Sequence, residues 1–312
     1  MIDFRSAVMD EKAVLAEGAV IERLSRSGSL LDEHLLVAPL VLEEGGRRAL
    51  REIYRSYIDV AAEAGLPIVI LAPTWKASPD ACERAGLDLA LTNSACVDFM
   101  RETVSEYPGM AGRIFLGGLV GSRGDSYRPD EALPRDTARR YHAPQFGALL
   151  ESGVDFVMAS TIPSVEEAAG ITMAAADAGA PLVMSFVARS DGKVLDGILL
   201  GDAVERIDGL GCEPPLFYMA NCVHPANFAR AMGRDGNAPL RASGRLIGLQ
   251  ANASTLDPDD LAGREELDAD DPVRWAGAMA ALREGFGIKI LGGCCGTDER
   301  YIRRLAHFLA DY

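Results

Sequence analysis

The sequence predicts a single (β/α)8 barrel domain over residues 1–312, and three observations support this fold class. About eight short apolar runs alternate with helix-like segments along the chain, which is typical of βαβ units around a parallel sheet. A length of 312 residues suits one α/β barrel, because this fold often occupies about 250 residues or more as one unit. No linker rich in Pro, Gly or Ser divides the chain.

The eight apolar runs are the expected strands. In chain order they are Ala13 to Ala16, Pro67 to Leu71, Ile114 to Leu119, Phe156 to Ala159, Leu182 to Val187, Leu216 to Met219, Leu246 to Gln250 and Ile288 to Leu291. A parallel barrel places the carboxyl ends of all these runs at one face, where the loops that follow them converge.

Helix signals fill the segments between the runs. Ser164 with Glu167 reads as a capping box before Ala168 to Ala178, and Asp271 followed by Pro272 reads as the start of a helix that ends near Gly285. Apolar residues with a period of 3.6 predict two further helices, namely Leu50, Ile53, Tyr54, Tyr57, Ile58 and Ala61 in one, and Ile302, Leu305, Phe308 and Leu309 in the other.

Composition and charge exclude several classes of protein. A formal net charge of −15 without a Lys/Arg cluster opposes binding to nucleic acid. The start, Met1 to Lys12, lacks an apolar signal core, and no apolar stretch is long enough to span a membrane, so we expect a cytoplasmic protein. The sequence does not fix an oligomeric state, and a homo-oligomer is compatible with it.

The segment from Ala251 to Asp270 has no strong periodicity and is strongly acidic. Its carboxylates are Asp257, Asp259, Asp260, Glu265, Glu266, Asp268 and Asp270, against the single Arg264. A connection this long is often a functional lid, but acidic runs are about as often solvated loops, and the sequence leaves both readings open.

Six cysteines in a chain of this length favour reduced thiols over a disulfide framework. Cys222 follows the sixth run, and the adjacent Cys294 and Cys295 follow the eighth, so all three can meet at the barrel mouth. Three cysteine ligands that leave a fourth position open are typical of a catalytic zinc site. The alternatives are that some of these cysteines are small buried hydrophobes and that His224 is a ligand, although a lone histidine is more often structural.

Zinc bound by three thiolates favours one more sulfur as its fourth ligand. A substrate thiol bound there loses its proton near neutral pH, and the thiolate is the nucleophilic form. The expected chemistry is therefore alkyl transfer to a thiol.

The string Gly292-Gly293-Cys294-Cys295-Gly296-Thr297, with Asn221-Cys222, resembles the homocysteine S-methyltransferase family. Weaker similarity covers nearly the whole chain, at Glu17-Gly18-Ala19, Thr161-Ile162-Pro163, Glu166-Glu167-Ala168 and Asp196-Gly197. The resemblance implies a (β/α)8 barrel enzyme that methylates a thiol such as homocysteine, with Zn²⁺ held by Cys222, Cys294 and Cys295. It also implies substrate-binding roles, and the residues expected to have them are Glu17, Ser160, Thr161, Asn221 and Gly293.

Three positions depart from the family pattern. Family members usually carry Asp where this chain has Glu17, Glu where it has Ser160, and Thr-Asn-Thr where it has Ala72-Pro73-Thr74. Loss of a carboxylate removes a charge-assisted hydrogen bond to an ammonium group, so the acceptor need not be homocysteine itself.

The resemblance implies a sulfonium, quaternary ammonium or methylfolate donor. Because this chain has no extra module of the kind that methylfolate and cobalamin enzymes carry, we expect a cationic donor of the S-methylmethionine, S-adenosylmethionine or betaine class, and Trp75 and Tyr127 are candidates to stabilise its charge. Two alternatives come from other classes of protein. One is a non-catalytic relative that keeps the zinc site to bind thiols or metal, and the other is a metal-free redox dithiol formed by Cys294 and Cys295.

Overall fold

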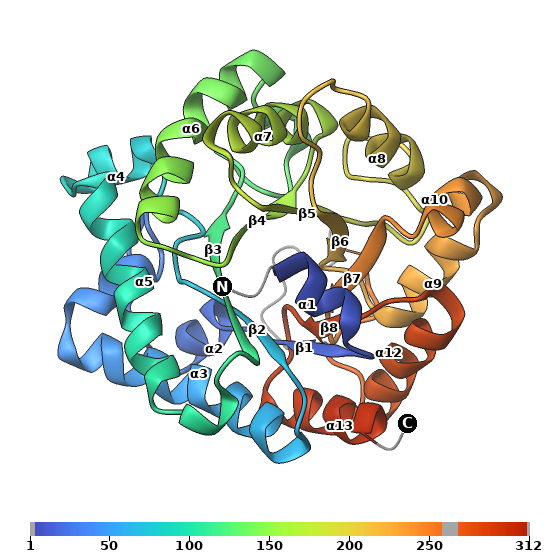
Figure 1. Cartoon of the computed structure of the whole chain (residues 1–312), viewed down its shortest axis with the longest axis horizontal. Coiled ribbons are helices and arrows are strands. Elements are labelled where there is room, and N and C mark those ends of the chain that lie inside the picture. Colours follow the sequence, from blue (N-terminus) through green and yellow to red (C-terminus); the bar gives the residue numbers. More distant parts are fainter. Residues whose placement is uncertain (1–3, 258–267, 311–312) are drawn as a thin grey trace.

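The computed structural model describes residues 4–257 and 268–310, and its core is a closed barrel of parallel strands (Figure 1). The strands are β1 Val14–Ala16, β2 Ile68–Leu71, β3 Ile114–Val120, β4 Phe156–Ile162, β5 Leu182–Val187, β6 Phe217–Asn221, β7 Leu246–Ala251 and β8 Ile290–Gly293. Each strand pairs with the next in chain order, and the pairs Val14 with Ile290 and Leu15 with Leu291 join β1 to β8. The predicted (β/α)8 fold class is confirmed.

All eight predicted strands are present, and the differences lie at their ends. The sixth strand runs on to Asn221, and the eighth begins at Ile290 and includes Gly292 and Gly293. The sulfur-bearing residues Cys222 and Cys294 therefore follow directly on the last residues of β6 and β8.

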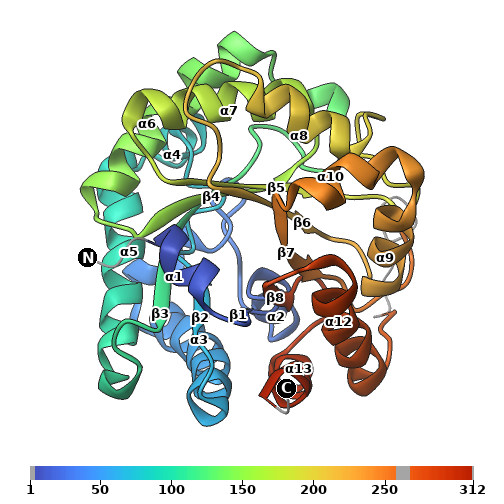
Figure 2. The ribbon, with the colours of Figure 1, turned by 45° about the vertical axis from the view of Figure 1, so that its right-hand side comes forward.

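Helices surround the barrel (Figures 1 and 2). They are α1 Phe4–Asp10, α2 Ile21–Arg26, α3 Glu44–Ala64, α4 Pro79–Ala85, α5 Leu89–Ser105, α6 Arg135–Glu151, α7 Val165–Ala178, α8 Leu200–Asp208, α9 Pro225–Gly233, α10 Ala238–Ser243, α12 Pro272–Phe286 and α13 Glu299–Ala310. Short 3₁₀ turns add η1 Ala38–Leu42, η2 Pro108–Met110, η3 Pro129–Glu131 and η4 Asp235–Asn237. The predicted apolar faces of α3 and α13 are buried apart from Phe308, which is partly exposed.

The predicted helix starts are confirmed, but one side chain has a different partner. Asp271 caps α12 by accepting from the N–H groups of Val273 and Arg274, and Ser164 caps α7 by accepting from Glu166 N–H at 3.2 Å. The second half of the predicted capping box is wrong. The carboxylate of Glu167 instead accepts hydrogen bonds from two backbone N–H groups of a neighbouring loop.

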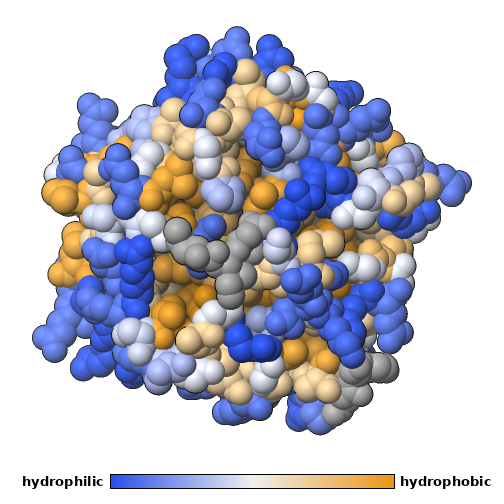
Figure 3. Space-filling view, viewed as in Figure 1, coloured by the Kyte–Doolittle hydropathy of each residue, from blue (hydrophilic) through white to orange (hydrophobic). Residues whose placement is uncertain are grey.

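The amino-terminal helix α1 covers the end of the barrel where the strands begin, and it faces the viewer in Figure 1. The Phe4 ring stacks on Phe156 at a centroid distance of 4.0 Å and also contacts Phe115 and Phe217. Seen from this end, the molecule has hydrophilic residues around its rim and more hydrophobic ones nearer its middle (Figure 3). This end is therefore closed by apolar packing.

Most of the central part of the acidic segment lies outside the described residues, so the choice between a lid and a solvated loop stays a prediction. At its described ends, Asp257 accepts hydrogen bonds from Ser190, and Asp268 accepts one from Ser254. In the described residues, no helix is both long and apolar enough to cross a membrane.

Candidate functional site

A cavity of about 430 Å³ opens at the other end of the barrel, where the strands finish. It lies between the aromatic loop residues Trp75 and Tyr127 on one side and the irregular segment that follows β1 on the other. All eight residues named from the sequence as ligands or substrate contacts line it, namely Glu17, Ser160, Thr161, Asn221, Cys222, Gly293, Cys294 and Cys295.

Three cysteine sulfurs meet in this cavity. Cys222 Sγ lies 3.2 Å from Cys294 Sγ, and hydrogen bonds from the Cys294 and Cys295 thiols hold the pKa of the Cys222 thiol well below its usual range. The same contacts raise the pKa of Cys294, and the hydrogen bond with Cys222 raises that of Cys295 to about 12. The three sulfurs thus lie close enough together to share hydrogen bonds.

Cys222 and Thr161 both have a left-handed backbone, with φ of 56° and 61°, which is rare and costly for residues other than glycine. The Asn221 side chain links the two residues. Its amide nitrogen donates to Thr161 Oγ1 at 2.8 Å and to Cys222 Sγ at 3.1 Å, while its oxygen accepts from Ser185 Oγ at 2.8 Å. These bonds allow the Asn221 amide to orient the Cys222 sulfur, and a role of Asn221 in substrate binding stays a prediction.

Glycines near the cysteine pair have two different roles. A Cβ atom at Gly293 would lie 2.1 Å from Thr297 Oγ1, so a side chain there would collide with the turn that carries the cysteines. Gly296 has φ of 80°, which allows the chain to reverse after Cys295. Close packing before the pair and a bend after it together aim both sulfurs into the cavity.

The two aromatic candidates face the cavity in different ways. The Tyr127 hydroxyl donates to Cys222 Sγ at 3.2 Å, so it lies at the sulfur cluster itself. Trp75 Nε1 donates to the Ser160 carbonyl at 3.1 Å, and the Lys76 ammonium lies 4.8 Å from the centre of the Trp75 ring. A protein cation therefore already lies at the Trp75 ring.

Glu17 is buried at the cavity wall, where its carboxylate accepts a hydrogen bond from Leu71 N–H at 3.0 Å. Burial raises the pKa of Glu17 to about 8, and the Leu71 bond only partly offsets that rise. Ser160 lies at the same cavity, and its hydroxyl is 3.5 Å from Thr161 Oγ1. The cavity wall therefore carries a buried carboxyl group whose protonated form is favoured by burial, and Ser160 adds a hydroxyl elsewhere in the same wall.

Sequence reasoning did not identify Glu22, Gln250 or the apolar wall of Ile21, Leu31 and Val37, all of which line the cavity. The Glu22 carboxylate accepts a hydrogen bond from Gly296 N–H and so supports the cysteine turn. Its position five residues after Glu17, at the start of a helix, was the only available signal.

The His224 ring is used structurally. Its Nδ1 accepts from Ala226 N–H at the start of α9, and its Nε2 lies 3.6 Å from Asp270 Oδ2. Neither nitrogen is directed at the sulfurs, so the structural reading of this histidine is favoured over a ligand role.

The donor set suits zinc in chemistry but not yet in spacing. Two thiolates on one tetrahedral zinc lie about 3.8 Å apart when each bond is roughly 2.3 Å, so the 3.2 Å separation of Cys222 and Cys294 must widen by a few tenths of an ångström. Accordingly, across residues 4–257 and 268–310, no three His, Cys, Asp or Glu side chains already have the spacing of a metal site. A small rotation of the Cys294 side chain would widen this separation, and three convergent cysteines are a ligand set that suits zinc, so the residues fit the ion.

Comparison with known proteins gives consistent matches along the chain. The family profile described as homocysteine S-methyltransferase matches residues 14–309. A homocysteine S-methyltransferase of Escherichia coli is 25% identical, with 96% of each chain covered, and the homocysteine S-methyltransferase YbgG of Bacillus subtilis is 21% identical, with 94% of this chain and 93% of the relative covered. The crystal structure of the E. coli homocysteine methyltransferase MmuM in its metallated form shares the fold, with a TM-score of 0.75 at 21% identity over 98% of this chain and 99% of that one.

Proposed function

The chain belongs to the homocysteine S-methyltransferase family, and from this premise we propose that it moves a methyl group from an onium donor to a thiol in a zinc-dependent reaction. The enzyme is an S-methyltransferase with a thiol acceptor, which disfavours the non-catalytic and redox alternatives. The observation that carries the proposal is the convergence of the Cys222, Cys294 and Cys295 sulfurs in one cavity.

In this proposal the three cysteines hold zinc, and the acceptor sulfur takes the fourth position. Bound zinc would keep the acceptor deprotonated and nucleophilic at neutral pH. The acceptor sulfur attacks the methyl carbon of the donor, and the bond between that carbon and the onium atom breaks. The onium atom keeps the electron pair, so the donor leaves as a neutral thioether or amine.

The charge of the cavity favours a cationic donor. Among the cavity-lining residues of the described chain, Glu17 and Glu22 are carboxylic acids and none is Lys, Arg or His. Attraction of a sulfonium or quaternary ammonium ion to the Glu22 carboxylate and to the cysteine thiolates of a zinc site would stabilise the bound donor, whereas Glu17 adds negative charge only after it loses its proton. An anionic donor such as a methylfolate lacks a cationic partner in this set.

For an acceptor that carries an ammonium group, Glu17 is the buried carboxyl group in the cavity wall, while Ser160 offers only a hydroxyl. Binding of an amino thiol there would favour the ionised form of Glu17 and release its proton. Homocysteine is thus the first acceptor to test, and thiols without the amino group are the comparison.

The test is a screen of thiols against methyl donors with zinc-loaded enzyme, read by mass spectrometry of the methylated thiol. Homocysteine, 3-mercaptopropionate and cysteamine serve as acceptors, and S-methylmethionine, S-adenosylmethionine and betaine serve as donors. We expect a methyl thioether from at least one onium donor. Absence of any product with zinc bound would contradict the proposal.

A further inference from the structure

The loop between β3 and α6, residues 121–134, carries Tyr127 to the sulfur cluster. It is irregular apart from the short turn η3, and Tyr127 is one of its most exposed apolar residues. The Tyr127 hydroxyl nevertheless lies 3.2 Å from Cys222 Sγ. An irregular loop needs fixed attachments to hold one hydroxyl at that position.

A single buried carboxylate supplies two of these attachments. Glu167 on α7 accepts from Arg123 N–H at 2.9 Å through Oε1 and from Leu133 N–H at 3.3 Å through Oε2. These two amides lie near the start and the end of the loop, so one side chain fixes both ends. The His142 ring of α6, itself fully buried, lies with Nε2 3.1 Å from Glu167 Oε1.

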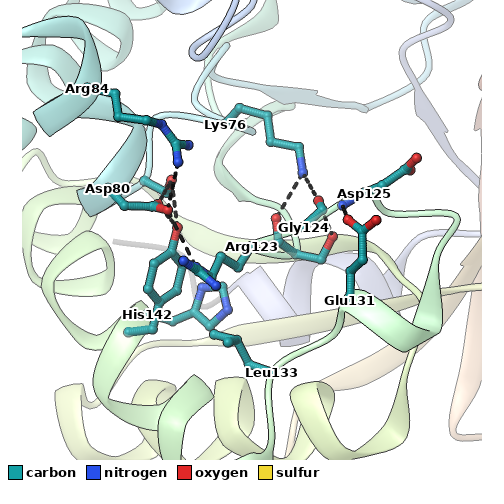
Figure 4. Close-up of polar contacts among 12 residues, drawn as sticks. Lys76, Asp80, Arg84, Arg123, Gly124, Asp125, Glu131, Leu133 and His142 are labelled. Atoms are coloured by element: carbon teal, nitrogen blue, oxygen red, sulfur yellow. Dashed lines mark hydrogen bonds and ion pairs between the residues drawn. The ribbon is translucent and has the colours of Figure 1, made fainter.

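A third attachment comes from the preceding loop of the barrel. The Lys76 ammonium donates to the carbonyls of Ser122 at 2.9 Å and Gly124 at 2.8 Å, as the dashed lines in Figure 4 mark. Lys76 follows Trp75, which lines the same cavity. Glu167 and Lys76, which bond this segment, and His142, which contacts Glu167, are here called the loop clamp.

The energetics favour a positioning role over simple stabilisation. Removing a carboxylate and an imidazole from water is costly, and apolar residues of similar size stabilise a core at least as well. What an apolar pair cannot do is hold two backbone N–H groups at fixed points. Neither Glu167 nor His142 is among the described residues that line the cavity, so neither contacts a ligand bound there directly.

We propose that the loop clamp is a set of positioning residues that holds the Tyr127 hydroxyl at the Cys222 sulfur. The inference rests on the proposed function, in which that sulfur is a zinc ligand. Tyr127 donates a hydrogen bond to the sulfur, which restrains its direction and draws charge from it. Loss of the clamp therefore acts as loss of Tyr127 does.

The experiment is a double-mutant cycle between Glu167→Gln and Tyr127→Phe, with Glu166→Gln as the matched control. Glu166 is the exposed neighbour of Glu167 on the same helix. A glutamine at 167 can accept only one of the two loop N–H groups, so we expect kcat/KM to fall roughly tenfold, as for loss of a hydrogen bond to a charged group. In the Tyr127→Phe background the same change should have almost no further effect, whereas Glu166→Gln should leave kcat/KM unchanged.

Hydrogen–deuterium exchange provides a readout that does not depend on turnover. Peptides covering residues 121–134 should exchange faster in Glu167→Gln than in the wild type, and Glu166→Gln should match the wild type. Lys76→Met is the second variant if Glu167→Gln does not fold, because it removes two loop contacts at a half-buried position and keeps the aliphatic stem. It should show the same dependence on Tyr127.

Two results would overturn the inference. Unchanged exchange in the loop would show that Glu167 does not hold it, and full additivity of the Glu167 and Tyr127 effects would show that Glu167 does not act through Tyr127. Absence of wild-type turnover would instead refute the proposed function, and the exchange experiment would still decide whether the clamp exists.

Discussion

The two ends of the barrel differ in the chemistry of the residues that lie there. Where the strands begin, Phe4 of α1 stacks on Phe156 and fills an aromatic cluster with Phe115 and Phe217. Where the strands finish, an open cavity combines an apolar wall with a buried carboxyl group, thiols and amides. The first end has the features of a stabilising core, and the second has few of them.

The difference indicates which end of the barrel contains features that cost free energy of folding. The site end has left-handed backbone at Cys222 and Thr161 and a buried acid at Glu17, each of which costs free energy of folding. The aromatic end has no comparable cost among its four rings. Substitutions should therefore separate, so that those at the site change activity and those at the aromatic end change stability.

The largest effect is expected for a direct loss of one sulfur. Cys294→Ser should abolish stoichiometric zinc and lower turnover by more than about 100-fold, since weaker disturbances around metal ligands already cost about that much. The free energy of unfolding of the zinc-free protein should change by less than about 1 kcal/mol, because Cys294 is only partly buried. Metal analysis, turnover and urea unfolding of the same samples check this.

Cys212→Ser is the matched control, since Cys212 is also half-buried and does not line the cavity. It should keep both zinc and turnover. Full zinc content with normal turnover in Cys294→Ser would show that Cys294 is not a zinc ligand.

At the aromatic end, Phe4→Ala should have the converse effect. Truncating a buried phenylalanine that contacts three other rings should lower the free energy of unfolding by about 3 kcal/mol. Turnover per folded molecule should stay at the wild-type value at a temperature where the variant remains folded. Thermal unfolding and steady-state kinetics measure the two quantities.

The exposed neighbour Arg5 offers the control, because Arg5→Ala changes the same helix without opening the cluster. A large loss of turnover in Phe4→Ala, with stability intact, would break the comparison between the two ends.

The buried acid at the site end makes stability depend on pH. The pKa of Glu17 is about 8 in the folded protein and near 4.5 when exposed, so the folded state binds the extra proton between these values. Its contribution is fully present below about pH 4.5 and is lost as pH rises toward about 8, at ~1.4 kcal/mol per pH unit. Replacing the acid by Glu17→Gln removes this slope.

The measurement compares urea unfolding of the wild type and Glu17→Gln at about pH 6 and pH 7, and the difference in stability should shift by about 1.4 kcal/mol in favour of the variant. Glu44→Gln, at an exposed position on α3, should follow the wild type at both values. If the free energy of unfolding changed equally in the wild type and in Glu17→Gln between these two pH values, Glu17 would not hold its proton in the folded protein.

The sequence was sufficient to predict the parts of the molecule in which apolar residues recur in a regular pattern. Eight apolar runs and the barrel rule that strand ends converge were enough to predict the fold class and to expect Cys222, Cys294 and Cys295 in one place. The short glycine-rich string also carries the family resemblance, because its spacing is specific.

What could not be predicted depends on contacts between distant irregular segments. The helix with Phe4 has seven residues, which is too short to display a clear period. Glu167 fits a capping-box pattern, yet its partners come from a loop more than thirty residues earlier, and no local pattern reports that choice. Glu22 lies at the start of the six-residue helix α2, which is too short to show a clear period, and Leu31 lies in irregular chain, where side-chain direction is set by packing alone.

The smallest predicted effect concerns the hydrogen bond that supports Asn221 at the site end of the barrel. Ser185 on β5 is fully buried, and its hydroxyl donates to Asn221 Oδ1 at 2.8 Å. Ser185→Ala should lower the free energy of unfolding by about 1 kcal/mol, the usual net value of one buried hydrogen bond, while Asn221 keeps its contacts with Thr161 and Cys222. Turnover should fall only a few-fold, because the amide is less restrained but still directed at the sulfur.

Thr172→Val is the matched loss of a buried hydroxyl, since Thr172 bonds to the Ala168 carbonyl inside α7 and lies outside the cavity lining. It should cost similar stability and no turnover. If both variants kept full turnover, Asn221 would need no support from β5, and the cost accepted at this end would lie in the left-handed backbone of Cys222 and Thr161 rather than in the hydrogen bonds around them.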